Sequence, residues 1–148
     1  MRYMIIVKAT RYSEAGIKPS QERVEAMKVY NEELAKAGVL LAEEKLYPSS
    51  SGMRITYSMP EDSPNITVGP FAEARELVAG FTLIEVNSVD EAYEWAIRMP
   101  NLHRFGESEI ELRQVYEAEE TLIDPKIQAM ENELRELIQP IQINKKGE

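Results

Sequence analysis

Two segments of this chain predict β-strands that are apolar on both faces. Residues 81–86 read Phe-Thr-Leu-Ile-Glu-Val, and residues 2–8 read Arg-Tyr-Met-Ile-Ile-Val-Lys. Because successive side chains of a strand point to opposite faces, neither segment has a plainly polar side. Burying an apolar side chain is worth roughly 1.5–3 kcal/mol, so both faces of these strands need cover. This need constrains the fold more than any other feature of the chain.

Two further segments predict long amphipathic helices. Residues 16–38 predict the first, with Ser20 as the N-cap and Gly38 placed to end it. Residues 88–100 predict the second, which opens with Ser88 in capping-box spacing and stops at a proline. The stripes that face a core are Val24, Met27, Asn31 and Leu34 in the first helix, and Ala92, Trp95, Ala96 and Met99 in the second.

The remaining predicted elements are short. Residues 39–47 and 53–59 predict two strands that form a hairpin around the turn-rich Pro-Ser-Ser-Ser-Gly segment. Residues 71–78 predict a helix of one or two turns, which Gly80 ends. Residues 108–117 alternate apolar and charged side chains, as expected of an edge strand.

The order of these elements predicts an α+β fold. It is the order of a ferredoxin-like split βαβ layer with an inserted short helix. Two long helices cover only one face of such a sheet, so the apolar side chains on the other face need a second cover. Most soluble oligomers are closed and two-fold symmetric, so we expect a homodimer, or a higher homo-oligomer, in which a second copy covers that face.

The end of the chain has a different character and predicts a helical tail. In residues 119–148, Asp124 is the expected N-cap, Pro125 takes the first helical position and Pro140 is expected to end the helix. We therefore divide the chain into a domain at 1–118 and this tail. The tail either packs on the body or the partner subunit, or it docks another protein. Its apolar stripe is Ile127, Met130, Leu134, Leu137, Ile138 and Ile141.

Composition excludes several classes of function. The chain has 148 residues, and 17 basic against 26 acidic side chains give a net charge of −9, which disfavours binding to nucleic acid or to an anionic membrane surface. It has no cysteine, which excludes a disulfide framework, a thiolate zinc site and a cysteine nucleophile. No signal peptide or stretch of about 20 apolar residues occurs, so we expect a cytoplasmic protein.

The most specific motif is Gly-Pro-Phe-Ala-Glu-Ala-Arg-Glu-Leu-Val-Ala-Gly-Phe at residues 69–81. With the strand and helix segments around it, it resembles the YCII-related family, in particular its DGPF-containing branch, over about residues 1–118. The resemblance implies a dimeric α+β barrel with the two sheets face to face. One position departs from the branch: Val68 stands where the motif usually has an aspartate before Gly-Pro-Phe.

The resemblance implies no reaction for this chain. The few members of the family credited with an activity resemble dechlorinating or lactone-processing enzymes, which use a His and Asp pair near the first helix. Residues 17–38 contain no histidine, so that pair cannot be carried over. Members of the DGPF branch are often encoded beside alternative sigma factors, which suggests a regulatory setting.

Five residues are the candidates for a site. His103 is the only histidine and the first candidate for a general base, with a surface or loop-bracing residue as the alternative. Glu73 and Arg75 start the predicted short helix and are candidates for orienting a ligand, with ordinary capping as the alternative. Tyr57 and Phe71 are candidates for lining a pocket, with core packing as the alternative.

No motif for a cofactor or a metal occurs. The serine run at 49–51 lacks the lysine and the following helix of a phosphate loop, and no nucleophile elbow or dinucleotide fingerprint is present. Two hypotheses therefore stand. The first is a cofactor-free acid–base enzyme, or a small-molecule binder, that acts on an aromatic or carbonyl-containing organic acid. The alternative is a non-enzymatic regulatory or protein-binding dimer.

Overall fold

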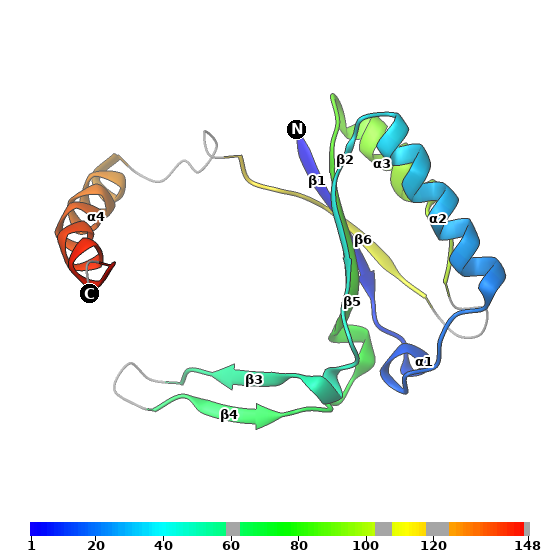
Figure 1. The fold of residues 1–148 in the computed structure, drawn as a ribbon, viewed down its shortest axis with the longest axis horizontal. Helices are drawn as coiled ribbons and strands as arrows, with labels where there is room; N and C mark the ends of the chain where they lie inside the picture. The colour runs from blue at the N-terminus through cyan, green and yellow to red at the C-terminus, as the bar shows by residue number, and fades with distance from the viewer. Residues whose placement is uncertain (59–62, 103–107, 118–124, 147–148) are drawn as a thin grey trace. The chain divides into compact units, whose positions relative to one another are not determined.

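A computed structural model describes residues 1–58, 63–102, 108–117 and 125–146 of the chain. The chain separates into two compact units, Met1–Val115 and Tyr116–Glu148. In the first unit, α2 (Gln21–Lys36) and α3 (Val89–Arg98) lie on one face of a four-stranded sheet (Figure 1).

The four-stranded sheet confirms the ferredoxin-like α+β prediction. Its strands are β1 (Arg2–Lys8), β2 (Leu40–Lys45), β5 (Val78–Glu85) and β6 (Ile110–Gln114). They lie in the order β2-β5-β1-β6, and all neighbours are antiparallel. The two strands predicted to be apolar on both faces are the two central ones, and β6 is an edge strand as predicted.

The hydrophobic core lies between the sheet and the two helices. Tyr3 and Ile5 of β1 and Ile84 of β5 face α2, where Leu34 is completely buried. The Tyr30 hydroxyl of α2 donates a hydrogen bond of 2.6 Å to the carbonyl oxygen of Trp95 in α3 and ties the two helices together. The buried cluster also includes Met27, Val39, Val86, Ala92 and Ala96.

The two central strands are also apolar on the opposite face of the sheet, as predicted, whereas Glu44, Glu111 and Arg113 of the edge strands share that face. Met4 pairs with Leu83 and Ile6 pairs with Phe81, and directly paired residues point to the same side of a sheet. All four side chains are half-buried. Neither α2 nor α3 covers this face (Figure 1).

The first long helix has the predicted ends and a slightly different buried face. Ser20 caps it by accepting a hydrogen bond from the Arg23 amide, and Gly38 follows its end with a φ of 74° that favours glycine. Val24 is exposed, whereas Tyr30 is buried in the stripe. Asn31 is half-buried, and its Oδ1 has no hydrogen-bond partner in the described part of the chain.

The predicted hairpin between residues 39–47 and 53–59 is wrong. β2 pairs with β5, and β3 (Met53–Thr56) pairs instead with β4 (Asn65–Val68) in a separate two-stranded sheet. The serines between β2 and β3 form a 3-10 turn, η1 (Ser49–Ser51), rather than a hairpin turn. A local pattern identifies a strand but does not identify its partner, and β5 offers β2 the better apolar surface.

The predicted helix at residues 71–78 is also wrong. Only a 3-10 turn, η2 (Ala74–Glu76), forms there, and the chain enters β5 at Val78. Gly80 therefore lies inside a strand rather than ending a helix. A short helix that the sequence did not predict, α1 (Arg11–Glu14), follows β1 with a Thr10 capping box.

Among its described residues, the second unit contains one helix, α4 (Pro125–Lys146). Pro125 takes the first helical position as predicted, and Asp124 lies outside the described residues. The prediction that Pro140 ends the helix is wrong, because helical backbone continues past it. Proline removes one backbone donor, but its fixed φ is itself compatible with a helix. The stripe residues described as exposed are Ile127, Met130, Leu134, Leu137 and Ile138.

Among the described residues, no helix is both long enough and apolar enough to span a membrane.

The tie between α2 and α3 generates a prediction about pH. Burial raises the pKa of Tyr30 from 10.0 to about 12, while Arg98 opposes this rise and Glu33 adds to it. The folded state therefore holds the phenol proton more tightly than the unfolded state. The neutral Tyr30 phenol makes its full contribution to the free energy of unfolding below pH 10. This contribution is lost as the pH rises towards 12.

Replacing Tyr30 by Phe should lower the free energy of unfolding by about 1 kcal/mol at pH ~8, because the bond to Trp95 is lost. Between pH ~8 and ~11, the wild type should lose about 1 kcal/mol more than the variant. Urea unfolding at both pH values measures this. An equal loss in the two proteins would contradict the assignment, since the variant retains every other tyrosine.

Candidate functional site

A β-bulge in β2 sets which of its side chains face the helices. Leu40 pairs with Ile84, and Ala42 pairs with Leu83, so two steps along β2 match one step along β5. Leu41 is the extra residue. Side chains alternate along a strand, so an extra residue inverts the alternation for everything that follows.

Beyond the bulge, two charged side chains face the helix-covered side. Glu43 pairs with Thr82 and Lys45 pairs with Gly80, and both partners belong to the face of β5 that includes the buried core. Glu44, between them, points to the opposite face. Without the bulge, Glu43 and Lys45 would lie on that opposite face instead. Bulges near functional sites commonly redirect side chains in this way.

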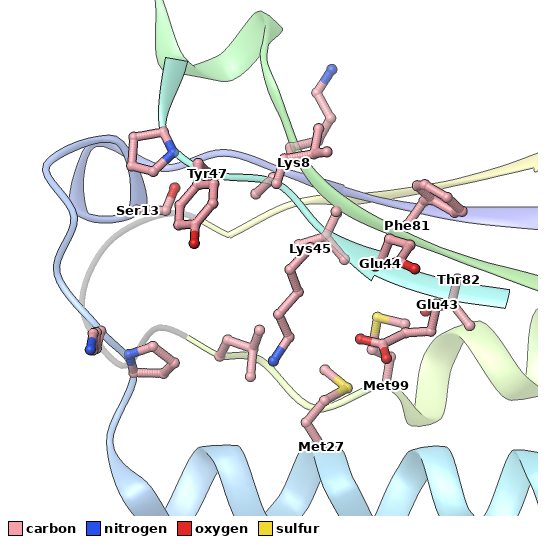
Figure 2. Close-up of a pocket in the computed structure, with 18 of the residues that line it drawn as sticks. Lys8, Ser13, Met27, Glu43, Glu44, Lys45, Tyr47, Phe81, Thr82 and Met99 are labelled. Atoms are coloured by element: carbon pink, nitrogen blue, oxygen red, sulfur yellow. The ribbon is translucent and has the colours of Figure 1, made fainter. Parts of the chain in front are cut away.

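Glu43 and Lys45 point into a cavity of about 390 Å³ between the sheet and α2 (Figure 2). Met27 of α2 and Met99 at the end of α3 form part of its apolar wall. Residues 16–19, which connect α1 to α2, line it from another side. A volume of several hundred cubic ångströms, with few polar groups in an apolar lining, is typical of small-molecule sites.

The cavity exists because β5 changes from small to large side chains along its helix-facing side. Gly80 and Thr82 lie at the cavity end, whereas Ile84 and Val86 fill the core end. Gly80 leaves the floor of the cavity without a side chain. A Cβ there would lie 2.8 Å from the Glu44 carbonyl oxygen, so the close pairing of β2 with β5 also requires glycine.

Glu43 and Lys45 have no charged partner in the described part of the chain. The side chains of Glu43 and Lys45 form no ion pair or hydrogen bond with the described residues. Glu43 is half-buried, and Lys45 is more exposed. Lys8 also contributes to the lining, but its amino group points away from the cavity (Figure 2). Lys18, in the connection between α1 and α2, also lines the cavity, and Lys45 is the cationic lining residue on the same side of β2 as Glu43.

Hydroxyl groups line the other end of the cavity. Ser13 of α1 and Tyr47, which follows β2, both lie there, and 87% of the Tyr47 surface is exposed (Figure 2). The cavity therefore combines a carboxylate, an ammonium group and neutral donors with apolar walls. Such a set can orient a small molecule and exchange a proton with it.

The Gly-Pro-Phe motif forms a structural brace beside this cavity. The Phe71 amide donates a hydrogen bond of 2.9 Å to Ser49 Oγ. The Glu14 carboxylate accepts two hydrogen bonds from Ser49, one from its amide at 2.8 Å and one from its hydroxyl. The Arg54 guanidinium stacks on the Phe71 ring, 4.3 Å from its centroid. The motif thus joins the base of the β3–β4 hairpin to α1.

Gly69 is required by this brace. A Cβ at Gly69 would lie 1.7 Å from the Ser49 carbonyl oxygen, a distance that no side chain tolerates. The Gly69 amide also donates a hydrogen bond of 3.0 Å to the Gly52 carbonyl, which closes the hairpin.

The structure does not place the sequence-predicted site residues in the described cavity. Tyr57 lies beyond β3 with 77% of its surface exposed, and Phe71 stacks with arginine at the hairpin base. Glu73 precedes η2 with a left-handed φ of 61° and makes no side-chain cap. The Arg75 backbone lies in η2, but its side chain is outside the described part, as is all of His103. The roles assigned to these five residues stay predictions.

Sequence reasoning missed Glu43 and Lys45, although a signal was present. Three consecutive charged residues, at 43–45, stand in a strand that must pack on at least one face. Alternation therefore forces either Glu44 or the other two towards the helices. Only the bulge decides which, and the sequence does not reveal it. Among the described residues, no cluster of three or more histidine, cysteine or acidic side chains is arranged to hold a metal.

Replacing Gly69 by Ala should disrupt the β3–β4 hairpin, because the Ser49 backbone must move to admit the new Cβ. We expect a loss of about 1–3 kcal/mol in local stability, typical of overpacking. Hydrogen exchange of the amides in residues 53–56 and 65–68 measures it. Gly52→Ala is the matched control, because its Cβ would lie 3.5 Å from the nearest atom. Similar protection in both variants would rule out the proposed role of Gly69.

Comparison with known proteins agrees with the fold. A family model of the YCII-related domain matches residues 1–119, which include the whole ferredoxin-like sheet and the Gly-Pro-Phe brace. A comparison with curated proteins found no match. Since the family model covers well over half of the sequence, the chain belongs to the YCII family.

Proposed function

We propose that this protein binds a small organic acid with an apolar body in the cavity between β2, β5 and α2. One observation carries the proposal: the β2 bulge brings Glu43 and Lys45 into an apolar cavity of about 390 Å³ whose floor is Gly80. Lys45 would hold the ligand carboxylate, and Met27 and Met99 would contact its apolar part.

The cavity also has the groups for cofactor-free acid–base chemistry on an aromatic or carbonyl-containing acid. Glu43 is a carboxylate directed into the cavity, where it is placed to take a proton from a bound ligand. The Tyr47 hydroxyl and Lys45 are hydrogen-bond donors for the oxygen on which negative charge would develop. His103 remains the predicted proton carrier from the sequence, and Glu43 is the candidate within the described residues.

Small aromatic and aliphatic carboxylic acids should raise the melting temperature of the wild type, because a ligand bound only by the folded state stabilises it. Lys45→Met should weaken the binding of the best acid about tenfold or more, since a charge-assisted hydrogen bond is lost. Lys8→Met is the matched control, because the Lys8 amino group points away. Thermal shift and isothermal titration calorimetry measure both effects.

Two results would refute the binding proposal. One is that no carboxylic acid stabilises the wild type. The other is that Lys45→Met and Lys8→Met weaken binding equally, which would place the acid elsewhere.

We also propose that the protein is a homodimer. The apolar sheet face opposite the helices, which holds Met4, Ile6, Phe81 and Leu83, supports this, because leaving it in water is unfavourable. A second copy of the same face is a self-complementary cover.

Sedimentation at micromolar concentration should give twice the monomer mass for the wild type. Leu83→Arg should give the monomer mass, because it places a charge at the centre of the apolar face. Val29→Arg, at an exposed position of α2, should remain dimeric. A wild-type monomer, or a dimer that Leu83→Arg leaves intact, would disprove this arrangement.

A second function, a regulatory or protein-binding dimer without enzymatic activity, is favoured by α4. Its stripe of Ile127, Met130, Leu134, Leu137 and Ile138 is exposed, as expected for a helix that docks another protein. This alternative predicts that acids fail to stabilise the wild type, so the thermal-shift experiment separates the two functions.

A further inference from the structure

We propose that the ligand of the cavity is a zwitterion, namely an amino acid with an aromatic or branched aliphatic side chain. This inference rests on the proposed function and narrows it from organic acids in general to one class. The observation behind it is that Glu43 and Lys45 present a carboxylate and an ammonium group to the cavity, and neither group pairs with another described residue.

The spacing of the two groups suits a ligand that carries both charges. Glu43 and Lys45 are two residues apart on the same side of β2, so their Cα atoms are about 7 Å apart along the strand. Both side chains are flexible and point into the same space (Figure 2). An α-carboxylate is placed to pair with Lys45 while the α-ammonium group of the same molecule pairs with Glu43.

Electrostatics favour a zwitterion over a simple acid. A bound ligand displaces water from the cavity, and an isolated charge is costly to remove from water unless it is paired. A monocarboxylate pairs with Lys45 but leaves Glu43 without a partner and adds a second negative charge beside it. A monoamine pairs with Glu43 but leaves Lys45 without a partner and adds a second positive charge beside it. A ligand with both groups supplies a partner to Glu43 and to Lys45 at the same time.

The remaining walls define the side chain of the ligand. Met27 and Met99 border the part of the cavity near Glu43, and methionines adapt to aromatic and aliphatic groups of different shape. The floor at Gly80 leaves space beneath the ligand. A polar or charged side chain would lose its hydration against these walls, so the site should disfavour acidic and basic amino acids.

The test uses the full-length protein and two sets of matched probes. The first set is L-phenylalanine, phenylpropionate, which lacks the ammonium group, and phenylethylamine, which lacks the carboxylate. The second set is L-leucine, isocaproate and isoamylamine. Titration calorimetry should show that the amino acid of at least one set binds about tenfold or more tightly than both of its analogues.

Two variants test which charged side chain of the protein pairs with which charged group of the ligand. Glu43→Gln should abolish the preference for the amino acid over the carboxylic acid and leave the binding of the acid unchanged or stronger. Lys45→Met should abolish the preference for the amino acid over the amine. Glu44→Gln is the control on the same strand, because that side chain points to the opposite face, and it should retain both preferences.

The outcomes distinguish this inference from the proposed function. If the carboxylic acids bind as tightly as the amino acids and Lys45→Met weakens them, the organic-acid site stands and the zwitterion inference is wrong. If Glu44→Gln lowers the preference as much as Glu43→Gln does, the inference is again wrong. If none of the six probes binds, both proposals fail together.

Discussion

The pairing of β2 with β5 is the interaction on which the site depends. It brings the Glu44 carbonyl so close to Gly80 that only glycine fits, and the same glycine leaves the cavity without a filled floor. It also contains the bulge that turns Glu43 and Lys45 towards the helices. The cavity, its floor at Gly80 and the inward direction of Glu43 and Lys45 therefore all depend on the pairing of these two strands. A regular ladder in the same place would direct both charges to the opposite face of the sheet.

Much of the fold follows from local signals in the sequence. Uninterrupted apolar residues in 2–8 and 81–86 predicted central strands, and these segments are β1 and β5. Ser20 and Ser88 predicted helix starts, and both cap helices by accepting backbone hydrogen bonds. Each signal acts within a few residues, through alternation or through an unsatisfied backbone donor. Such signals can be recognised without knowledge of the rest of the chain.

The errors and omissions concern contacts between distant segments. The segment after Gly69 looked helical, but the Phe71 amide is bonded to Ser49, which lies 22 residues earlier in the chain, and no local pattern indicates that contact. The site was missed for the same reason. Whether Glu43 or Glu44 faces the helices depends on register against β5, and an inserted residue in a ladder leaves no local signature.

The Gly-Pro-Phe turn at residues 69–71 and the cavity share one support. Phe71 and Gly69 contact Ser49, which is bonded to Glu14 of α1. Ser13, the neighbour of Glu14, lines the cavity. Gly69 and Phe71 therefore act on the site through the position of α1, whereas Gly80, at the other end of the same motif, forms the floor of the cavity. Val68, directly before this turn, lies in the exposed hairpin, where it pairs with Met53, and it is not among the described lining residues of the cavity.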